Sequence, residues 1–178
     1  MGTCATVIKG INASCDSSMG GVKKVYLLPN DSEFVLATGD TGTNVTGITS
    51  ATTTAYEFNF KKNTVSMTST LNVDAANGVN YISTELTMQF TRMETEKRTA
   101  IQALAIGQCK AVVVDANGEA WLLGYDEPLE ATAGTAQTGQ AKTDGNFYSI
   151  TLTDESVEFP YALTADALKA VEDIVVKA

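Results

Sequence analysis

Three stretches in the middle of the chain alternate between apolar and polar residues: 56–61, 64–72 and 80–91. Because successive side chains of a β-strand point to opposite faces, a period of two predicts strands with one face on a core and the other toward solvent. The segment 74–78, Asp-Ala-Ala-Asn-Gly, is typical of a turn. We therefore expect residues 64–72 and 80–91 to form a long antiparallel hairpin.

One face of this predicted hairpin is polar, rich in Thr and Ser, and carries few charges. Such a face is either open to water or opposed to another hydrated surface. Its members are Thr64, Ser66, Thr68, Thr70, Ser83, Glu85, Thr87 and Gln89.

The first part of the chain has weaker patterns. Residues 1–20 are small and polar, which indicates a loosely packed N-terminal arm. Two apolar runs within residues 25–36 flank a turn-forming Pro-Asn-Asp-Ser segment, so we expect a hairpin there. Residues 37–54 are mostly Thr, Gly, Ser, Ala and Asn, which predicts a long surface loop with one short strand near Val45.

The apolar spacing changes to that of a helix after residue 91. It predicts a helix over residues 94–106, with Gly107 as its C-cap. Two short apolar runs, 111–114 and 120–123, flank an Asp-Ala-Asn-Gly turn and predict a second hairpin.

The last part of the chain should add two strands and a helix. We expect a strand at 129–133 and a flexible loop of Gly, Thr, Ala and Gln at 134–145. An alternating strand follows at 146–153, with Tyr148, Ile150 and Leu152 inward, and 157–161 is a candidate extension of it. Residues 164–177 predict an amphipathic helix N-capped by Thr164. Its apolar stripe packs either on its own sheet or on a second subunit, and the candidate subunit contacts are Leu168, Val171 and Val175.

The composition narrows the possible functions. The chain has 178 residues, 44% of them hydrophobic and 19% charged, which suits one globular domain. It contains no His, which excludes Ser-His and Cys-His nucleophile pairs and removes the commonest transition-metal ligand. A formal net charge of -9 argues against wrapping nucleic acid on an outer basic surface. The three Cys residues form no C-x-x-C pair, so a reducing compartment is the simplest interpretation.

The candidate chemistry is sparse, and we expect no catalytic residue, no cofactor and no metal site. The carboxylates Glu127 and Glu130, or Asp154 with Glu155 and Glu158, could act as an acid–base pair, but solvated carboxylates near turns are commoner. Three aromatic residues could stack on a sugar ring, although core packing is the commoner role. They are Trp121, Tyr125 and Tyr148.

Four stretches carry a resemblance to a known family: 20–27 (GGVKKVYL), 96–98 (EKR), 112–124 (VVVDANGEAWLLG) and 132–139 (TAGTAQTG). In their residues and in their order along the chain, these stretches resemble small virion proteins of phages that infect gut Bacteroidetes, including the crAss-like group. The pattern of predicted strands and helices is similar to that of phage tail tube proteins. The resemblance covers residues 20–162 and leaves the C-terminal helix unmatched.

The resemblance implies a mainly β fold, an antiparallel β-sandwich or open barrel of tail-tube type with one internal helix and a short C-terminal helix. The domain would span 21–162, between the arm 1–20 and the helix 163–178. Six copies, or a multiple of six, would form a ring or tube in a phage tail or head–tail junction. The polar hairpin face listed above would line the lumen, through which DNA passes during ejection without sequence-specific binding.

This interpretation places the protein in the virion after assembly in the host cytoplasm, next to other tail or connector proteins and with no membrane contact. The arms 1–20, 37–54 and 134–145 would become ordered on assembly. Two alternatives remain open. The first is a monomeric β-sandwich that binds carbohydrate or protein through Trp121 or Tyr125. The second, with least support, is an enzyme that uses carboxylates alone.

Overall fold

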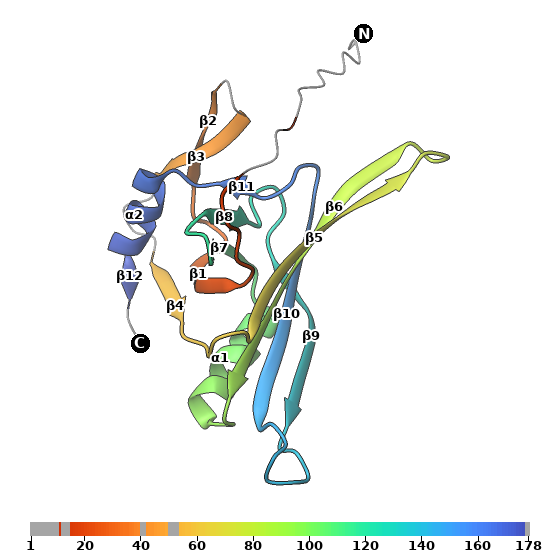
Figure 1. The fold of residues 1–178 in the computed structure, drawn as a ribbon, viewed down its shortest axis with the longest axis vertical. Helices are drawn as coiled ribbons and strands as arrows, with labels where there is room; N and C mark the ends of the chain where they lie inside the picture. Colours follow the sequence, from red (N-terminus) through yellow and green to blue (C-terminus); the bar gives the residue numbers. More distant parts are fainter. Residues whose placement is uncertain (1–10, 12–14, 40–41, 50–53, 177–178) are drawn as a thin grey trace.

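The computed structural model describes residues 11, 15–39, 42–49 and 54–176 of the protein. It is mainly β, with two helices and three sheets (Figure 1). Most of the predicted N-terminal arm, 1–20, therefore lies outside the described residues. Among the described residues, no helix is long and apolar enough to span a bilayer.

A six-stranded sheet forms the middle layer of the molecule. Its central strands are β1 (Val22–Pro29) and β7 (Cys109–Asp115), which pair antiparallel. Both contain four consecutive buried residues, 25–28 and 111–114, because this sheet is covered on both faces. The other strands, in the order β11-β8-β7-β1-β4-β12, are β11 (Tyr161–Ala162), β8 (Ala120–Leu123), β4 (Ala55–Phe58) and β12 (Val175–Val176).

A four-stranded antiparallel sheet covers one face of the middle layer (Figure 1). The helix α1 (Thr95–Ile106) packs beside it with partly buried Ile101 and Leu104. Leu86, Leu152 and Val113 lie in the core between the two sheets. The strands, in spatial order, are β5 (Val65–Asp74), β6 (Val79–Thr91), β10 (Phe147–Ser156) and β9 (Glu130–Gln137).

The other face of the middle layer is covered by α2 (Ala165–Asp173) and by a separate hairpin. That hairpin consists of β2 (Phe34–Gly39) and β3 (Gly42–Ile48). Tyr26 and Leu122 lie in this second core. The molecule thus has two cores, one on each face of a single sheet.

Several predicted elements are confirmed. The hairpins 64–72/80–91 and 111–114/120–123, the helix 94–106 and the strand 146–153 correspond to β5–β6, β7–β8, α1 and β10. The Thr164 side chain caps α2 by accepting a hydrogen bond of 3.3 Å from the N–H of Ala167. Gly107 ends α1 as expected, and its N–H donates to the carbonyl of Ala103 at 3.0 Å.

The predicted hairpin over 25–36 is wrong. β1 pairs with β4 and β7, and β2 pairs with β3. Residues 25–28 are buried on both faces because β1 lies at the centre of the middle sheet, which is covered on each side. The turn at 29–32 sends the chain out of this sheet into another layer. The predicted long loop over 37–54 is also wrong, since most of the described residues in this range belong to the hairpin β2–β3.

Three further boundaries need correction. The predicted loop over 134–145 begins only at 138, because β9 continues to Gln137 beside β10. Segment 157–161 does not extend β10, which ends at Ser156. Instead the chain turns back so that β11 pairs with β8. The end of the predicted helix 164–177 is also different, since α2 stops at Asp173 and Val175 enters β12 beside β4.

Candidate assembly surface

The eight polar residues predicted to share one face of the long hairpin do share it. The register pairs Ser66 with Thr87, Thr68 with Glu85 and Thr70 with Ser83. Thr64 lies next to Gln89, whose N–H donates to the Thr64 carbonyl at 2.9 Å. All eight side chains are exposed or half-buried. The predicted outward face of the hairpin is therefore confirmed, whereas a role in lining a lumen stays a proposal.

This polar face continues over the other two strands of the sheet, which the sequence did not reveal. The hydroxyls of Thr87 and Thr151 lie 3.1 Å apart between β6 and β10. The hydroxyls of Thr132 and Thr153 lie 2.9 Å apart between β9 and β10. The result is a hydroxyl-rich surface across all four strands, which we call the hydroxyl face.

The two outer strands of this sheet, β5 and β9, have no further strand partner among the described residues. β5 has 10 residues and β9 has 8, with no Pro in either and charged residues only at Asp74 and Glu130. Long edges without Pro or central charges are templates for pairing with another chain. Because each strand in the order β5-β6-β10-β9 is antiparallel to the next, β5 and β9 run in opposite directions.

The tip of the β5–β6 hairpin extends beyond the rest of its sheet (Figure 1). β10 pairs with β6 only as far as Ile82, which leaves the last residues of the hairpin without a neighbouring strand. We call residues 71–81 the arm from here on; it is distinct from the predicted N-terminal arm 1–20. Its exposed apolar side chains are Leu71 (53% exposed), Val73 (66%), Val79 (47%) and Tyr81 (36%).

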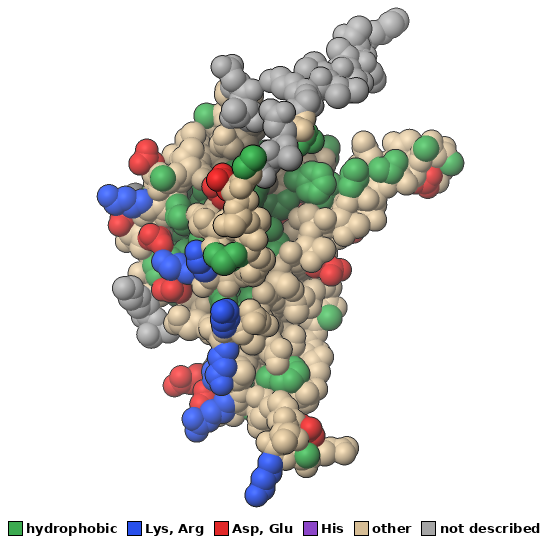
Figure 2. Space-filling view, in the orientation of Figure 1, with side chains coloured by type: hydrophobic (Ala, Val, Ile, Leu, Met, Phe, Trp, Pro, Cys, Tyr) green, Lys and Arg blue, Asp and Glu red, His purple; other side chains and the backbone are tan. Residues whose placement is uncertain are grey.

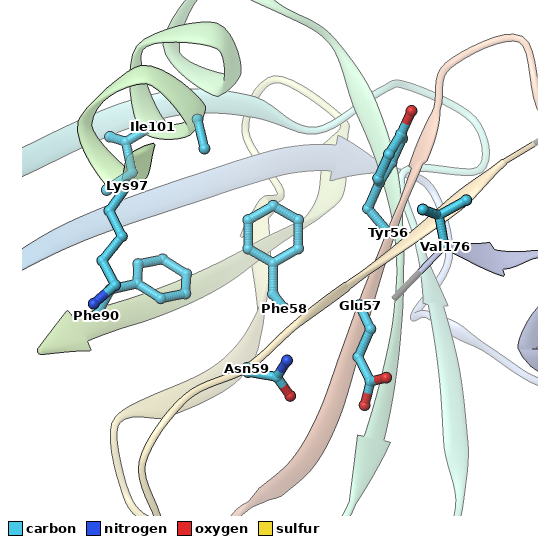
Figure 3. Close-up of a pocket in the computed structure, with 9 residues that line it drawn as sticks. Tyr56, Glu57, Phe58, Asn59, Phe90, Lys97, Ile101 and Val176 are labelled. Atoms are coloured by element: carbon cyan, nitrogen blue, oxygen red, sulfur yellow. The ribbon is translucent and has the colours of Figure 1, made fainter. Parts of the chain in front are cut away.

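An apolar groove of about 500 Å³ lies between β4 and α1 (Figure 3). The rings of Phe58 and Phe90 pack there at an interplanar angle of 55°, with centroids 5.9 Å apart, and Tyr56 and Ile101 extend the wall. The Nζ of Lys97 is held by Glu94 and by the Thr91 carbonyl, each at 2.8 Å. The described residues of the lining are mostly apolar, and Glu57 and Lys97 are the charged side chains among them.

The candidate acid–base carboxylates Asp154, Glu155 and Glu158 differ in burial. Asp154 is buried, and its Oδ2 accepts a hydrogen bond of 2.8 Å from the N–H of Gly124. Its Oδ1 has no hydrogen-bond partner among the described residues, and burial raises the pKa of this carboxyl. Glu155 and Glu158 are exposed. In the part of the chain that the structure describes, no group of three acidic or Cys side chains could hold a metal ion.

The aromatic residues considered for sugar stacking do not form one platform. Trp121 is half-buried against the first core, whereas Tyr125 packs against the second and contacts Tyr161 edge-on, with centroids 5.4 Å apart. Tyr148 lies on β10 and is half-buried.

The C-terminal residues predicted as subunit contacts pack within their own subunit. Val171 is fully buried in the second core, so its selection as a contact is wrong. Leu168 and Val175 pack against the same core and keep only partial exposure. The physical reason is that the middle sheet needs a cover on its second face, and the apolar stripe of α2 supplies it.

Comparison of the chain with protein-family models, with curated proteins and with solved structures finds no match.

Proposed function

We propose that this protein is a structural subunit that assembles with copies of itself into a ring or tube of a phage tail or head–tail junction. The edges β5 and β9 join neighbouring copies, and the hydroxyl face lines a conduit for DNA. The observation that carries the proposal is the pair of opposite, unprotected sheet edges. The sequence resemblance to phage tail tube proteins supports six copies, or a multiple of six, in each ring.

The strand directions suit a closed ring. Rotation about a ring axis keeps every strand's direction along that axis, so β5 of one copy would meet β9 of the next. These strands run in opposite directions, and the pairing would be antiparallel, as it is everywhere else in this sheet. Each copy would contribute one edge of each kind. Once the ring closes, no edge of this four-stranded sheet would remain unpaired.

The hydroxyl face suits the lumen of a DNA conduit. Thr and Ser side chains hold water by hydrogen bonds and present no positive charge to phosphates. Lys and Arg are absent from the hydroxyl-face positions 64, 66, 68, 70, 83, 85, 87 and 89. DNA would therefore pass without the phosphate contacts that dominate protein–DNA affinity.

Cross-linking across the two edges tests the proposal. Thr68→Cys on β5 and Thr135→Cys on β9 place one thiol near the middle of each edge, in a background with Cys4 and Cys15 changed to Ser. A short bis-maleimide should produce a ladder of covalent oligomers that ends at one closed ring. Each single-Cys variant should give only monomer and dimer.

A matched control uses positions inside the sheet. Thr87→Cys with Thr151→Cys places thiols on the same face but on inner strands, so only intramolecular products should form. If the edge variant gives no ladder at concentrations where the protein is folded, the proposal is wrong. The monomeric binding-module alternative would then be favoured.

A further inference from the structure

A basic pocket of about 640 Å³ lies at one end of the four-stranded sheet, where β6 ends and α1 begins. Among the described residues of its lining, the cations are Lys61, Arg92 and Lys97, and the carboxylate is Glu94. The whole chain has a formal net charge of -9, so this excess of positive charge is local. In Figure 2, Lys and Arg side chains run down toward the lower end of the molecule, where Figure 1 places α1.

The pocket opens at the end of the hydroxyl face. Gln89 and Thr91 lie on the same side of β6 as Thr87, because successive side chains of a strand alternate between its two faces. Phe147, which also lines the pocket, pairs with Thr91 across the sheet. The hydroxyl face, whose positions on β5 and β6 carry no positive charge, therefore ends at a group of cations.

Arg92 is held in an uncommon backbone conformation at this pocket. Its φ is +67°, a value that few residues other than Gly, Asn and Asp adopt. Asn146 stabilises the conformation twice: its carbonyl accepts from the N–H of Arg92 at 2.7 Å, and its Oδ1 accepts from the N–H of Met93 at 2.9 Å. The Arg92 side chain stays 82% exposed. The backbone is thus fixed while the guanidinium remains accessible, and strain of this kind is concentrated at functional sites.

Glu94 shows that an oxyanion fits between two of the cations. Its Oε1 lies 3.1 Å from Arg92 Nε, and its Oε2 lies 2.8 Å from Lys97 Nζ. The hydrogen bond from Lys97 is the main cause of the lowered pKa of Glu94, so this carboxylate is charged at neutral pH. Lys61 forms no ion pair with any described residue. Three cations against one carboxylate leave the pocket with a net charge of +2.

We propose that this pocket binds phosphate groups of a nucleic-acid backbone through Lys61, Arg92 and Lys97. Arg and Lys bind phosphate by charge-assisted hydrogen bonds, and Arg can do so through two N–H groups at once. The phosphate competes with Glu94 for Arg92. Because Arg92 and Lys61 are exposed, the site suits a polymer that lies across it better than a free ion, which needs an enclosing cradle.

Phosphate contacts carry no sequence information, so we expect binding that is independent of DNA sequence. The binding itself does not require assembly. Its role rests on the proposed function: in a ring, the pocket would hold DNA at one mouth of a lumen that otherwise presents no positive charge.

Anisotropy of a labelled DNA duplex of about 20 base pairs, measured from about 0.05 M to about 0.3 M salt, tests the site. Lys61→Gln with Arg92→Asn should weaken binding about tenfold at low salt. It should also reduce the slope of log affinity against log salt by about 2, at about 0.9 for each lost contact. Asn is used at position 92 because it adopts a positive φ more readily than Gln.

The matched control is Lys23→Gln with Lys169→Gln. Both side chains are exposed and lie outside the pocket lining, and the pair makes the same change in net charge. It should bind the duplex like the wild type. No binding by the wild type, or equal binding by the pocket variant and the control variant, would overturn the proposal.

Glu94→Gln should change the affinity in the opposite direction. It frees Arg92 and Lys97 from their carboxylate partner, so affinity for the duplex should rise about threefold or more. The Glu94 side chain makes no capping hydrogen bond to α1, so the helix should be retained. If these ion pairs serve only the fold, this variant loses stability and gains no affinity, which contradicts the proposal.

Inorganic phosphate is the second probe. At about 10 mM it should displace the duplex no more than chloride of equal ionic strength does; stronger displacement would indicate a site for free phosphate and overturn the nucleic-acid assignment. DNA binding by a protein that never forms rings would support the pocket and count against the conduit. Rings whose subunits do not bind DNA would overturn the pocket alone.

Discussion

The N–H of Gly124 donates a hydrogen bond of 2.8 Å to Oδ2 of Asp154, and this bond joins the two main sheets. Gly124 follows β8 of the middle sheet with a φ of +76°, which few residues other than Gly adopt, and Asp154 belongs to β10. A Cβ at position 124 would meet the Cys109 carbonyl oxygen and the Leu129 nitrogen at 3.1 Å each. A Gly at this position allows the turn to approach the backbone of Cys109 and Leu129 closely.

Because Asp154 is buried, we predict that the protein loses stability as the pH rises. Burial raises the pKa of Asp154 above the ordinary value of 3.8, so the folded protein holds this proton to a higher pH than the unfolded chain. Between the two pKa values, folding takes up a proton, and stability falls as pH increases. Asp154→Asn should keep the bond from Gly124, unfold at the same or a higher temperature at pH 7, and lose this pH dependence.

Thermal unfolding of both proteins across acid and neutral pH checks this prediction. Asp154→Ala is the control, because it leaves the Gly124 N–H without an acceptor and should cost about 1–3 kcal/mol. A wild-type advantage over Asp154→Asn that grows with pH would show that the ionised carboxylate is favoured in the fold.

The two cores should contribute independently to stability. Leu152 is fully buried between the two sheets, and Leu122 is buried on the opposite face of the middle sheet. Each change to Ala should lower the free energy of unfolding by about 2–5 kcal/mol. Urea unfolding measures both. Thr151→Ala, on the hydroxyl face, is the control and should cost about 1 kcal/mol or less. A small effect for Leu122→Ala would contradict the second core.

The contact between α2 and β1 should depend on pH and salt. Glu172 Oε1 accepts from Lys24 Nζ at 2.8 Å and from the Tyr26 hydroxyl at 2.9 Å. These bonds, the one from Lys24 first, lower the pKa of Glu172, so their contribution is present above its ordinary pKa of 4.5 and is lost as pH falls through the lowered value.

Glu172→Gln should therefore cost at most about 1 kcal/mol at neutral pH, because the ion pair is half exposed and screened by solvent. The difference from the wild type should shrink in acid and in high salt. Tyr26→Phe is the matched control, since it removes the hydroxyl bond and keeps the ion pair. A difference that is independent of both pH and salt would mean that electrostatic attraction in this pair contributes nothing to the free energy of unfolding.

The arm should affect association and not folding. Leu71→Ser with Val73→Ser changes two side chains that are more than half exposed, so the free energy of unfolding should stay within about 0.5 kcal/mol of the wild type. Self-association, measured as the mass by light scattering, should weaken. Thr68→Ser with Thr70→Ser, on the same strand but on the hydroxyl face, should leave association unchanged. Equal association of both double variants would remove the arm from the contact between copies.

Local patterns predicted the half-buried strands well and the fully buried or small-residue strands poorly. β5, β6 and β10 alternate because one face meets the first core, so their hydroxyl-bearing side could be identified from the sequence. The run 25–28 carries no period, and its partners β4 and β7 are distant in the sequence. β9 consists mostly of Ala, Thr and Gly and was predicted in part as a loop, although backbone pairing with β10 makes it a strand.

Only the pattern of polar side chains on the candidate assembly surface could be predicted from the sequence. The eight polar positions follow from alternation along β5 and β6, but edge position is a property of the whole sheet. Nothing local in β5 or β9 distinguishes an edge from a central strand, apart from their exposed apolar or small residues.

The central claim is that copies join through β5 and β9, and imaging the purified wild-type protein over a range of concentrations tests it most directly. We predict rings or stacked rings of one defined diameter in electron micrographs, with masses by light scattering that are multiples of one ring. A protein that stays monomeric at every concentration, with the bis-maleimide edge variant also monomeric, would contradict the account.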